Sequence, residues 1–380
     1  MTLTIIRELA RENRELWSGS ERKELLLKWT ICLGILSGVA LSPRLWFGPR
    51  ALPTIPVFPN LPDLPTIITI AISILFVLVT LLVAIVPKAK THILVATTIV
   101  GVLILFDINR LQPWVYMYIL MLVSFTFPGK DKICANVATI IALTYTWSGI
   151  QKLNLSFAAD VFPWMFGEKL THFWFVPPIL EIGIGICLLI PKVRLAGLIG
   201  AIGINLSMLY MLGPLNQNFN SVVWPWNVCL LVASLIVFLK SSDAILLRTW
   251  ETNIGKFIII LVGIMPGFNF IGMWDDYLSA QLYAGSTKEG YVLLTPKGLD
   301  SVPKSYRPYV TMQNDRTGFD LIEWSSSELN VPIYPEFRVY RVLVRKLVEQ
   351  GIPESEMTLI VNDRPAIWNS KVEYRKEPVR

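Results

Sequence analysis

The sequence predicts a mainly α-helical, polytopic membrane protein: a bundle of about nine spans followed by a small α+β domain on the outer face. Of its 380 residues, 53% are hydrophobic and only 16% are charged, which is too apolar for a soluble domain of this length. The formal net charge of +6 lies in short loops between apolar runs. It therefore indicates membrane topology, and nucleic-acid binding is not expected.

The first segment, residues 1–28, is predicted to be an amphipathic helix that is cytoplasmic or interfacial. Charged residues alternate there with Ile5, Leu9, Leu16 and Leu27, a pattern typical of a helix lying on a membrane surface. An ordinary solvated helix is the alternative. Because this segment is polar, no cleavable signal peptide is expected, and the first span should direct insertion itself.

Residues 29–272 are predicted to form the transmembrane bundle. Apolar runs of roughly the length that a span needs follow one another through this region. Loops that are short or rich in proline separate the runs. The runs lie near residues 29–43, 66–87, 92–107, 113–127, 133–151, 173–190, 194–212, 221–239 and 255–272.

Lysine and arginine residues predict the orientation of the bundle, because they accumulate in every second loop and cytoplasmic loops are enriched in these residues. The N-terminus is therefore predicted to be cytoplasmic. An odd number of spans then leaves residues 273–380 on the outer side. The basic loops carry Lys88 and Lys90, Lys130 and Lys132, Lys192 and Arg194, and Lys240, Arg248 and Lys256.

The unusual polar and aromatic motifs of the membrane region all map to the opposite, outer loops. A shared outer site that binds substrate is one interpretation. An aromatic belt with loop packing explains the pattern equally well, since Trp and Tyr concentrate at membrane interfaces. The candidate substrate-binding residues are Asn109, Arg110, Gln112 and Trp114 before the fourth span, Tyr145 in the fifth, His172 before the sixth, and Asn216, Asn218 and Trp226 around the start of the eighth.

Two ionisable residues are the candidate catalytic groups. Lys152 ends the fifth span and shares a helical face with Tyr145 and Ser148. A lone lysine at this depth is ordinarily a snorkelling anchor. Glu181 lies near the middle of the sixth span, where a carboxylate is costly and is by default a functional hypothesis. A protonated glutamate that hydrogen-bonds a neighbouring helix is the alternative.

Metal and disulfide chemistry are not expected. The four cysteines lie in or beside apolar runs and form no C-x-x-C motif. The two histidines, His92 and His172, fall on opposite sides of the predicted membrane. A histidine metal site is therefore excluded.

Residues 273–380 are predicted to be an extracytoplasmic α+β domain. Residues 290–294 and 357–361 have the composition of short strands. Residues 335–350 carry an apolar stripe at helical spacing and end at Gly351. The domain has no Gly-rich phosphate loop, no Ser/His/Asp set and no metal-ligand spacing. A core or docking role is the default.

The stretch Ser148-Gly149-Ile150-Gln151-Lys152-Leu153-Asn154 resembles the Gly-x-x-Lys-Leu segment of the horizontally transferred transmembrane domain family. That family includes the vitamin K-dependent gamma-carboxylases and is distantly similar to DoxX-like membrane proteins. Residues 107–114, 216–227 and 268–277 also look like bacterial members. The resemblance implies a protein of the bacterial inner membrane with a periplasmic C-terminal domain.

The resemblance also implies a quinol or quinone as cofactor and assigns Lys152 the role of the base that deprotonates reduced vitamin K. A lysine desolvated at the membrane boundary is suited to that role. The carboxylases have a histidine early in the fourth span, where this chain reads Leu111-Gln112-Pro113-Trp114. This difference argues against glutamate carboxylation.

Two functional hypotheses result. In the first, the protein is a quinone-linked oxidoreductase with Lys152 as base or head-group ligand and Glu181 as proton relay. It predicts a lipid-accessible cavity beside these residues and residues 216–227. In the second, the protein is a non-catalytic accessory subunit of a larger membrane complex, and its partners are membrane lipids and the other subunits. It predicts that the same groups satisfy one another without a cavity.

Overall fold

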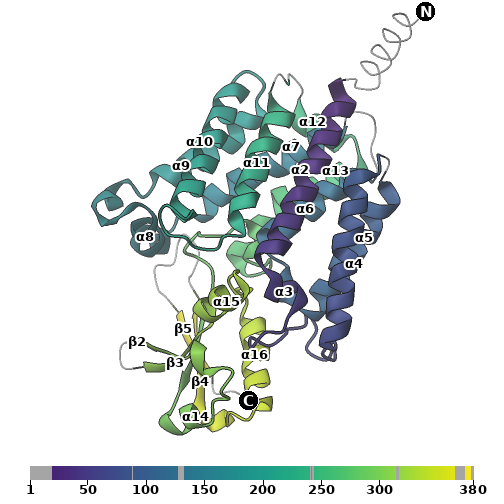
Figure 1. Ribbon diagram of the computed structural model, residues 1–380. Coiled ribbons are helices and arrows are strands. Elements are labelled where there is room, and N and C mark those ends of the chain that lie inside the picture. Colours follow the sequence, from purple (N-terminus) through teal and green to yellow (C-terminus); the bar gives the residue numbers. More distant parts are fainter. Residues whose placement is uncertain are drawn as a thin grey trace, which may run out of the picture.

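The computed structural model describes residues 19–87, 89–126, 132–239, 241, 244–313, 316–363 and 373–377. Residues 1–18, most of the predicted N-terminal amphipathic helix, lie outside the described residues. The described chain is mainly helical and adds a small antiparallel sheet near its C-terminus, as predicted (Figure 1).

Each of the nine apolar runs contains a helix. Five of the helices are long and apolar enough to cross a membrane, and the other four are shorter apolar helices. That all nine helices cross the membrane therefore stays a prediction. The helices are α2 (Gly19–Leu41), α4 (Thr66–Ile85), α5 (Lys90–Phe106), α6 (Pro113–Val123), α7 (Lys132–Gln151), α9 (Val176–Leu189), α10 (Arg194–Leu212), α11 (Val223–Phe238) and the stretch formed by α13 (Asn253–Ile258), η4 (Ile259–Ile264) and η5 (Met265–Ile271).

Short helical elements fill the connections between these helices. The short elements are α3 (Pro43–Phe47), η1 (Ile108–Arg110), η2 (Phe157–Val161), α8 (Phe162–Phe166), η3 (Glu168–Phe173), α12 (Ile245–Trp250) and η6 (Tyr277–Ser279). Two of them, α3 and α8, have proline in the first turn, where a helix needs no N–H donor.

The two ends of the bundle differ in chemistry. At the end nearer the N-terminus, basic side chains join the helix ends: Lys28 Nζ donates to the Val86 carbonyl at 2.5 Å, and Arg194 Nη1 donates to the Ser241 carbonyl at 2.9 Å. The C-terminal unit lies against the other end (Figure 1). This separation agrees with the predicted division of the loops, although the Lys88, Lys130 and Lys240 positions are outside the described residues.

Glycines allow α7 and α9 to pack closely. A Cβ atom added at Gly149 would lie 2.5 Å from the Pro178 carbonyl oxygen, and one added at Gly185 would lie 2.5 Å from the Ala142 carbonyl oxygen. Small residues permit this kind of backbone approach between apolar helices. The close approach brings the C-terminal end of α7 beside the middle of α9.

Replacing Gly185 by alanine is expected to destabilise the bundle by about 1–3 kcal/mol, because the new methyl group meets backbone atoms of α7 that cannot move independently. Gly183 is the matched control. It lies on the same helix, and a Cβ atom there meets nothing within 4 Å, so Gly183→Ala should be neutral or slightly stabilising. Denaturant unfolding in detergent measures both. Equal stability of the two variants would show that the helices do not pack in this way.

The C-terminal unit, residues 273–363 and 373–377, contains a five-stranded antiparallel sheet of order β2-β3-β1-β4-β5. The two predicted strands are confirmed as β1 and β4 and the predicted helix as α16. Helices α15 and α16 both contact β1, where their side chains meet Gly290. The elements are β1 (Glu289–Leu294), α14 (Pro296–Asp300), η7 (Arg307–Tyr309), β2 (Thr311–Gln313), β3 (Arg316–Asp320), α15 (Leu321–Leu329), α16 (Phe337–Glu349), η8 (Glu354–Glu356), β4 (Met357–Asp363) and β5 (Glu373–Glu377).

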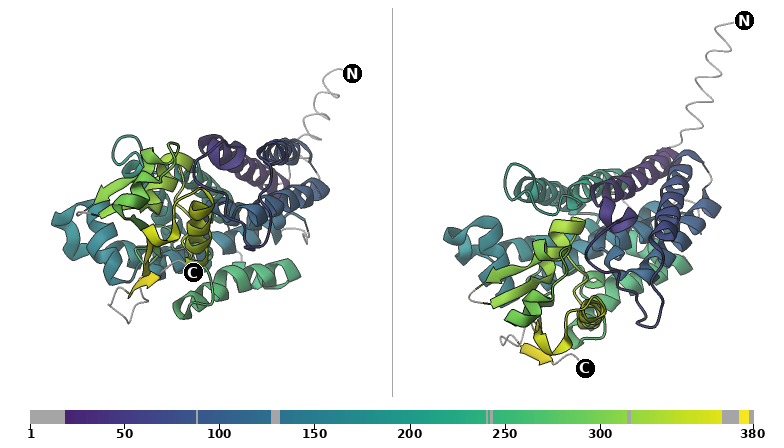
Figure 2. Two further views of the ribbon diagram at one scale, coloured as in Figure 1. Left: turned by 90° about the horizontal axis from the view of Figure 1, so that it is seen from below. Right: turned by 60° about the horizontal axis from the view of Figure 1, so that its bottom comes forward.

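The C-terminal unit docks on the end of the bundle and lies in front of the helices in the view from below (Figure 2). The segment between α15 and α16 makes several of the contacts. The Tyr334 amide donates to Asn109 Oδ1 at 3.0 Å, and Gln112 Nε2 donates to the Pro332 carbonyl at 3.0 Å. Asn330 Nδ2 donates to the Leu41 carbonyl at 2.8 Å. The loops at this end of the bundle, which are the loops predicted to be outer, thus carry the interface with this unit.

Candidate functional site

A buried ion pair joins the two candidate catalytic residues. Lys152 directly follows α7, and Glu181 lies on α9. Lys152 Nζ lies 2.7 Å from Glu181 Oε2 and 3.0 Å from Oε1, and it also donates to Ser148 Oγ at 2.5 Å. The two side chains are only 8% and 10% exposed. Each charge is therefore compensated inside the protein, and removing either would leave the other buried and unpaired.

A cavity lies beside this pair, at the end of the bundle that faces the C-terminal unit. We name it the Lys152 cavity. Its volume is about 110 Å³, which is enough for several water molecules or for a small ring. Residues of α6, α7, α9, α10, α11 and the 262–283 segment line it. Its aromatic lining consists of Tyr116, Tyr145, Trp147, Trp226, Tyr277 and Tyr283.

Three buried polar atoms of cavity-lining residues have no hydrogen-bond partner among the described residues. They are Tyr116 Oη, Trp226 Nε1 and Asn205 Oδ1. The amide nitrogen of Asn205 is satisfied, since it donates to Tyr145 Oη at 2.6 Å. Buried polar groups in proteins are nearly always paired. These three atoms are therefore available to pair with a polar molecule in the cavity.

The segment that follows η5 closes the outer side of the cavity. Asn154, two residues after Lys152, donates from Nδ2 to the Ala284 carbonyl at 2.8 Å and accepts from the Phe157 amide at 2.8 Å. Gln281 Nε2 donates to Gln151 Oε1 at 2.9 Å. Hydrogen bonds thus tie the residues on either side of Lys152 to residues 281–284. Two residues of that segment, Leu282 and Tyr283, line the cavity.

Of the predicted substrate-binding residues, the structure brings Tyr145 and Trp226 to the same cavity as Lys152 and Glu181. It places Asn109, Arg110 and Gln112 elsewhere, in the contact between the outer loops and the C-terminal unit. The Arg110 guanidinium, for example, donates to the Leu45 carbonyl at 3.1 Å and to the Leu103 carbonyl at 2.8 Å. These side chains hold loops together.

The other predicted residues also lie away from the cavity. Trp114 is buried against Trp46 and Tyr118, with ring centroids 6.3 and 6.1 Å apart. Asn216 and Asn218 are exposed in a turn, and His172 is exposed on η3. None of the four is among the residues that line the Lys152 cavity. Their predicted role in binding substrate gains no support from their positions.

Sequence reasoning missed several cavity residues. Asn205 carries a signal, because it is an amide inside an apolar run, but such an amide ordinarily hydrogen-bonds a neighbouring helix. Tyr116 lies in a run that also contains Tyr118, and periodicity alone does not say which tyrosine faces a cavity. Tyr283 has a positive φ of 58° in an irregular segment, where no pattern predicts side-chain direction.

A second cluster of charges lies where the C-terminal unit meets the bundle. Lys288 Nζ lies 3.0 Å from Asp276 Oδ1 and 3.3 Å from Glu336 Oε2. Burial, together with the neighbouring Asp276 carboxylate, raises the pKa of Glu336 to about 7, although Lys288 opposes the shift. Burial also raises the pKa of Asp276. Two acids thus share one lysine next to the wall of the Lys152 cavity.

Comparisons of the chain with protein-family models, with curated proteins and with solved structures each give no match. Among the described residues, no group of three or more His, Cys, Asp and Glu side chains is arranged to hold a metal ion. The site is therefore interpreted from its own geometry: an ion pair, an aromatic cavity and three polar atoms without partners.

Proposed function

We propose that this chain is an integral protein of the bacterial inner membrane whose Lys152 cavity binds the head group of a quinol or quinone. In this proposal all nine apolar helices span the membrane, the N-terminus is cytoplasmic, and the C-terminal unit is periplasmic. The observation that carries the proposal is the charged pair in the wall of a mainly aromatic and apolar cavity. A flat aromatic ring with hydroxyl or carbonyl groups matches both kinds of surface.

The proposed chemistry is proton exchange with the quinol. Lys152 is held as an ammonium by Glu181, so the free carboxylate lone pairs of Glu181 are the better proton acceptor. Glu181 would accept a proton from the hydroxyl of a bound quinol, and the Lys152 ammonium would stabilise the negative charge left on that oxygen. The unpartnered Tyr116 hydroxyl and Trp226 N–H are available to the oxygen on the other side of the ring.

One observation favours the alternative, an accessory subunit without catalytic activity. The Lys152 ammonium has three hydrogen bonds to protein atoms, so the pair is complete without a ligand. The adjoining cavity and its unpartnered polar atoms favour ligand binding. Quinone binding distinguishes the two alternatives, because an ion pair with a purely structural role does not require a quinone beside it.

Replacing Tyr116 by phenylalanine tests the proposed binding mode. The variant should weaken binding of a short-chain menaquinol by roughly 3- to 10-fold, the effect of losing one hydrogen bond. Folding stability should not fall, because the lost hydroxyl has no hydrogen-bond partner in the part of the chain that the structure describes. The measurement is a fluorescence titration of the full chain in nanodiscs.

Tyr118→Phe is the matched control for this titration. Tyr118 lies on the same helix, but its hydroxyl lies against Gly34 and it does not line the cavity. The Tyr118→Phe variant should bind menaquinol as tightly as the wild type does. Absence of saturable menaquinol binding to the wild type would refute the proposed function, and equal affinities for all three proteins would refute the assignment of Tyr116.

A further inference from the structure

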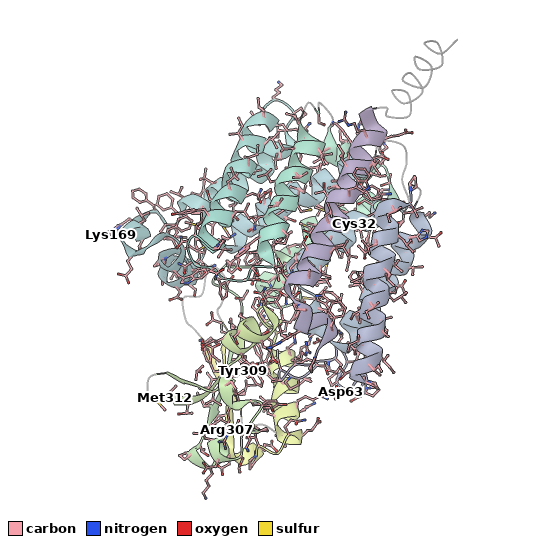
Figure 3. The ribbon with its side chains drawn as sticks, viewed as in Figure 1. Cys32, Asp63, Lys169, Arg307, Tyr309 and Met312 are labelled. Atoms are coloured by element: carbon pink, nitrogen blue, oxygen red, sulfur yellow. The ribbon has the colours of Figure 1, made fainter. Side chains whose placement is uncertain are left out.

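A second and larger cavity lies between the outer loops of the bundle and the C-terminal unit, and we name it the Arg50 cavity. Its volume is about 690 Å³, and the two cavities share no lining residue. Residues 44–69 form one side, and residues of η7, α15 and α16 form the other. In Figure 3, Asp63 marks the bundle side and Tyr309 the C-terminal unit. Its basic lining residues are Arg44, Arg50, Arg110 and Lys346.

Two guanidinium groups and one buried carboxylate meet at the inner wall of this cavity. Arg50 Nη2 lies 2.8 Å from Asp107 Oδ2, and the Asp107 side chain is fully buried. Arg110 also faces this carboxylate, but it donates its hydrogen bonds to backbone carbonyls, which carry no net charge. Asp107 is thus shared by two guanidinium groups that are largely shielded from water.

Three acidic residues also line the cavity, and other donors hold them. Asp63 pairs with Lys346 and accepts from Thr54 Oγ1 at 3.0 Å, and Glu349 Oε2 lies 3.7 Å from Lys346 Nζ. Glu328 accepts from the Leu52 amide at 2.7 Å and from Trp324 Nε1 at 3.0 Å. Among the described residues, none of the three carboxylates is an ion-pair partner of Arg50 or Arg110. They offset the charge of the cavity as a whole, but none of them accepts a hydrogen bond from Arg50 Nη1.

Two independent features point to an anion. First, Arg50 Nη1 has no hydrogen-bond partner among the described residues, although the Arg50 side chain is only 7% exposed. A buried guanidinium nitrogen without an acceptor is costly. Second, α4 starts at this cavity: Thr66 and Thr69 line it, and the N-cap residue Pro65 makes no side-chain hydrogen bond to the first turn. The N–H groups at the start of a long helix favour negative charge.

We propose that the Arg50 cavity binds a phosphate group, either free in solution or carried by the head group of an anionic phospholipid. Arg50 and Arg110 supply the fixed positive charge, and the start of α4 supplies N–H donors. Arg44 lies at the exposed side of the cavity, where it contacts the rest of the ligand. The volume accommodates a head group of many atoms, and the position at the outer end of the bundle is next to the proposed membrane surface.

The test uses the full chain with two probes: inorganic phosphate, followed by thermal shift in detergent, and phosphatidylglycerol, followed by native mass spectrometry against phosphatidylcholine. Arg44→Gln should weaken binding about tenfold, the usual effect of losing a charge-assisted hydrogen bond. Arg50→Lys should weaken it similarly, since lysine can keep the Asp107 ion pair but has no second nitrogen arm. Lys304→Gln is the control, because Lys304 is exposed nearby and does not line the cavity.

Saturable stabilisation by phosphate that Arg44→Gln weakens supports a soluble ligand. Retention of one phosphatidylglycerol that survives excess phosphate and is lost in Arg44→Gln supports a lipid head group. The proposal is overturned if neither probe binds saturably, or if Arg44→Gln and Arg50→Lys bind as tightly as Lys304→Gln. Because Arg44 is exposed, a folding defect is not expected in that variant.

Discussion

Glu181→Gln is expected to lower the stability of the protein by about 3–5 kcal/mol, the cost of leaving one member of a buried ion pair without its partner. Lys152 would keep Ser148 as a neighbour but would lose its only carboxylate in the described structure. The same change should abolish quinol binding and quinol-dependent proton release. Denaturant unfolding measures the first effect, and menaquinol titration measures the second.

A double replacement separates the structural role of the pair from its functional role. Lys152→Met with Glu181→Gln removes both charges together, so most of the lost stability should return. Quinol binding should not return, since neither the carboxylate nor the ammonium is present. Glu168→Gln removes an exposed acid from η3 and should change neither property. A double variant that binds menaquinol as the wild type does would contradict the role given to the pair.

Docking of the C-terminal unit is expected to weaken as pH rises from about 5 to 8. The pKa of Glu336 is raised from its ordinary value of 4.5 to about 7 in the docked protein. Docking therefore keeps a proton on Glu336 that the water-exposed group would release. The stabilising contribution is complete below pH 4.5 and is lost as pH rises through about 7. The buried Asp276, whose pKa is also raised, acts in the same direction.

Hydrogen exchange of the backbone amides in residues 273–340 measures this effect, with faster opening expected at pH 8 than at pH 5. Glu336→Gln should flatten the dependence and slow opening at pH 8, because the amide is neutral at both values. Glu354→Gln, an exposed acid of the same unit, should leave the profile of the wild type unchanged. Opening that becomes slower as pH rises in the wild type would show that the lowered pKa of Asp275 dominates instead.

The positions of the helices followed from the sequence because apolar runs of this length have few alternative structures. The small sheet was only partly predictable. Strands β1 and β4 are apolar, whereas β3, at Arg316–Asp320, carries polar and glycine residues whose strand structure depends on pairing with β1. Such tertiary effects override local preference.

The candidate site was predicted as two separate residues. Lys152 and Glu181 were selected for different reasons, one at a span end and the other within a span. Their contact depends on how closely α7 and α9 approach, which Gly149 and Gly185 determine, and a single sequence does not reveal which glycines face another helix. The loop residues Asn109 and Arg110 illustrate the opposite case, because residues suited to ligands can also hold backbone carbonyls and amides in place.

The most direct test of the central proposal is the quinone content of the full chain purified from its native membrane in nanodiscs. Extraction and quantitation should give about one quinone or quinol for each wild-type chain, in keeping with a single cavity of this kind. The Lys152→Met/Glu181→Gln variant, if folded as expected, should retain almost none. Wild-type protein without quinone, or equal quinone in both proteins, would contradict a quinol site at Lys152 and Glu181.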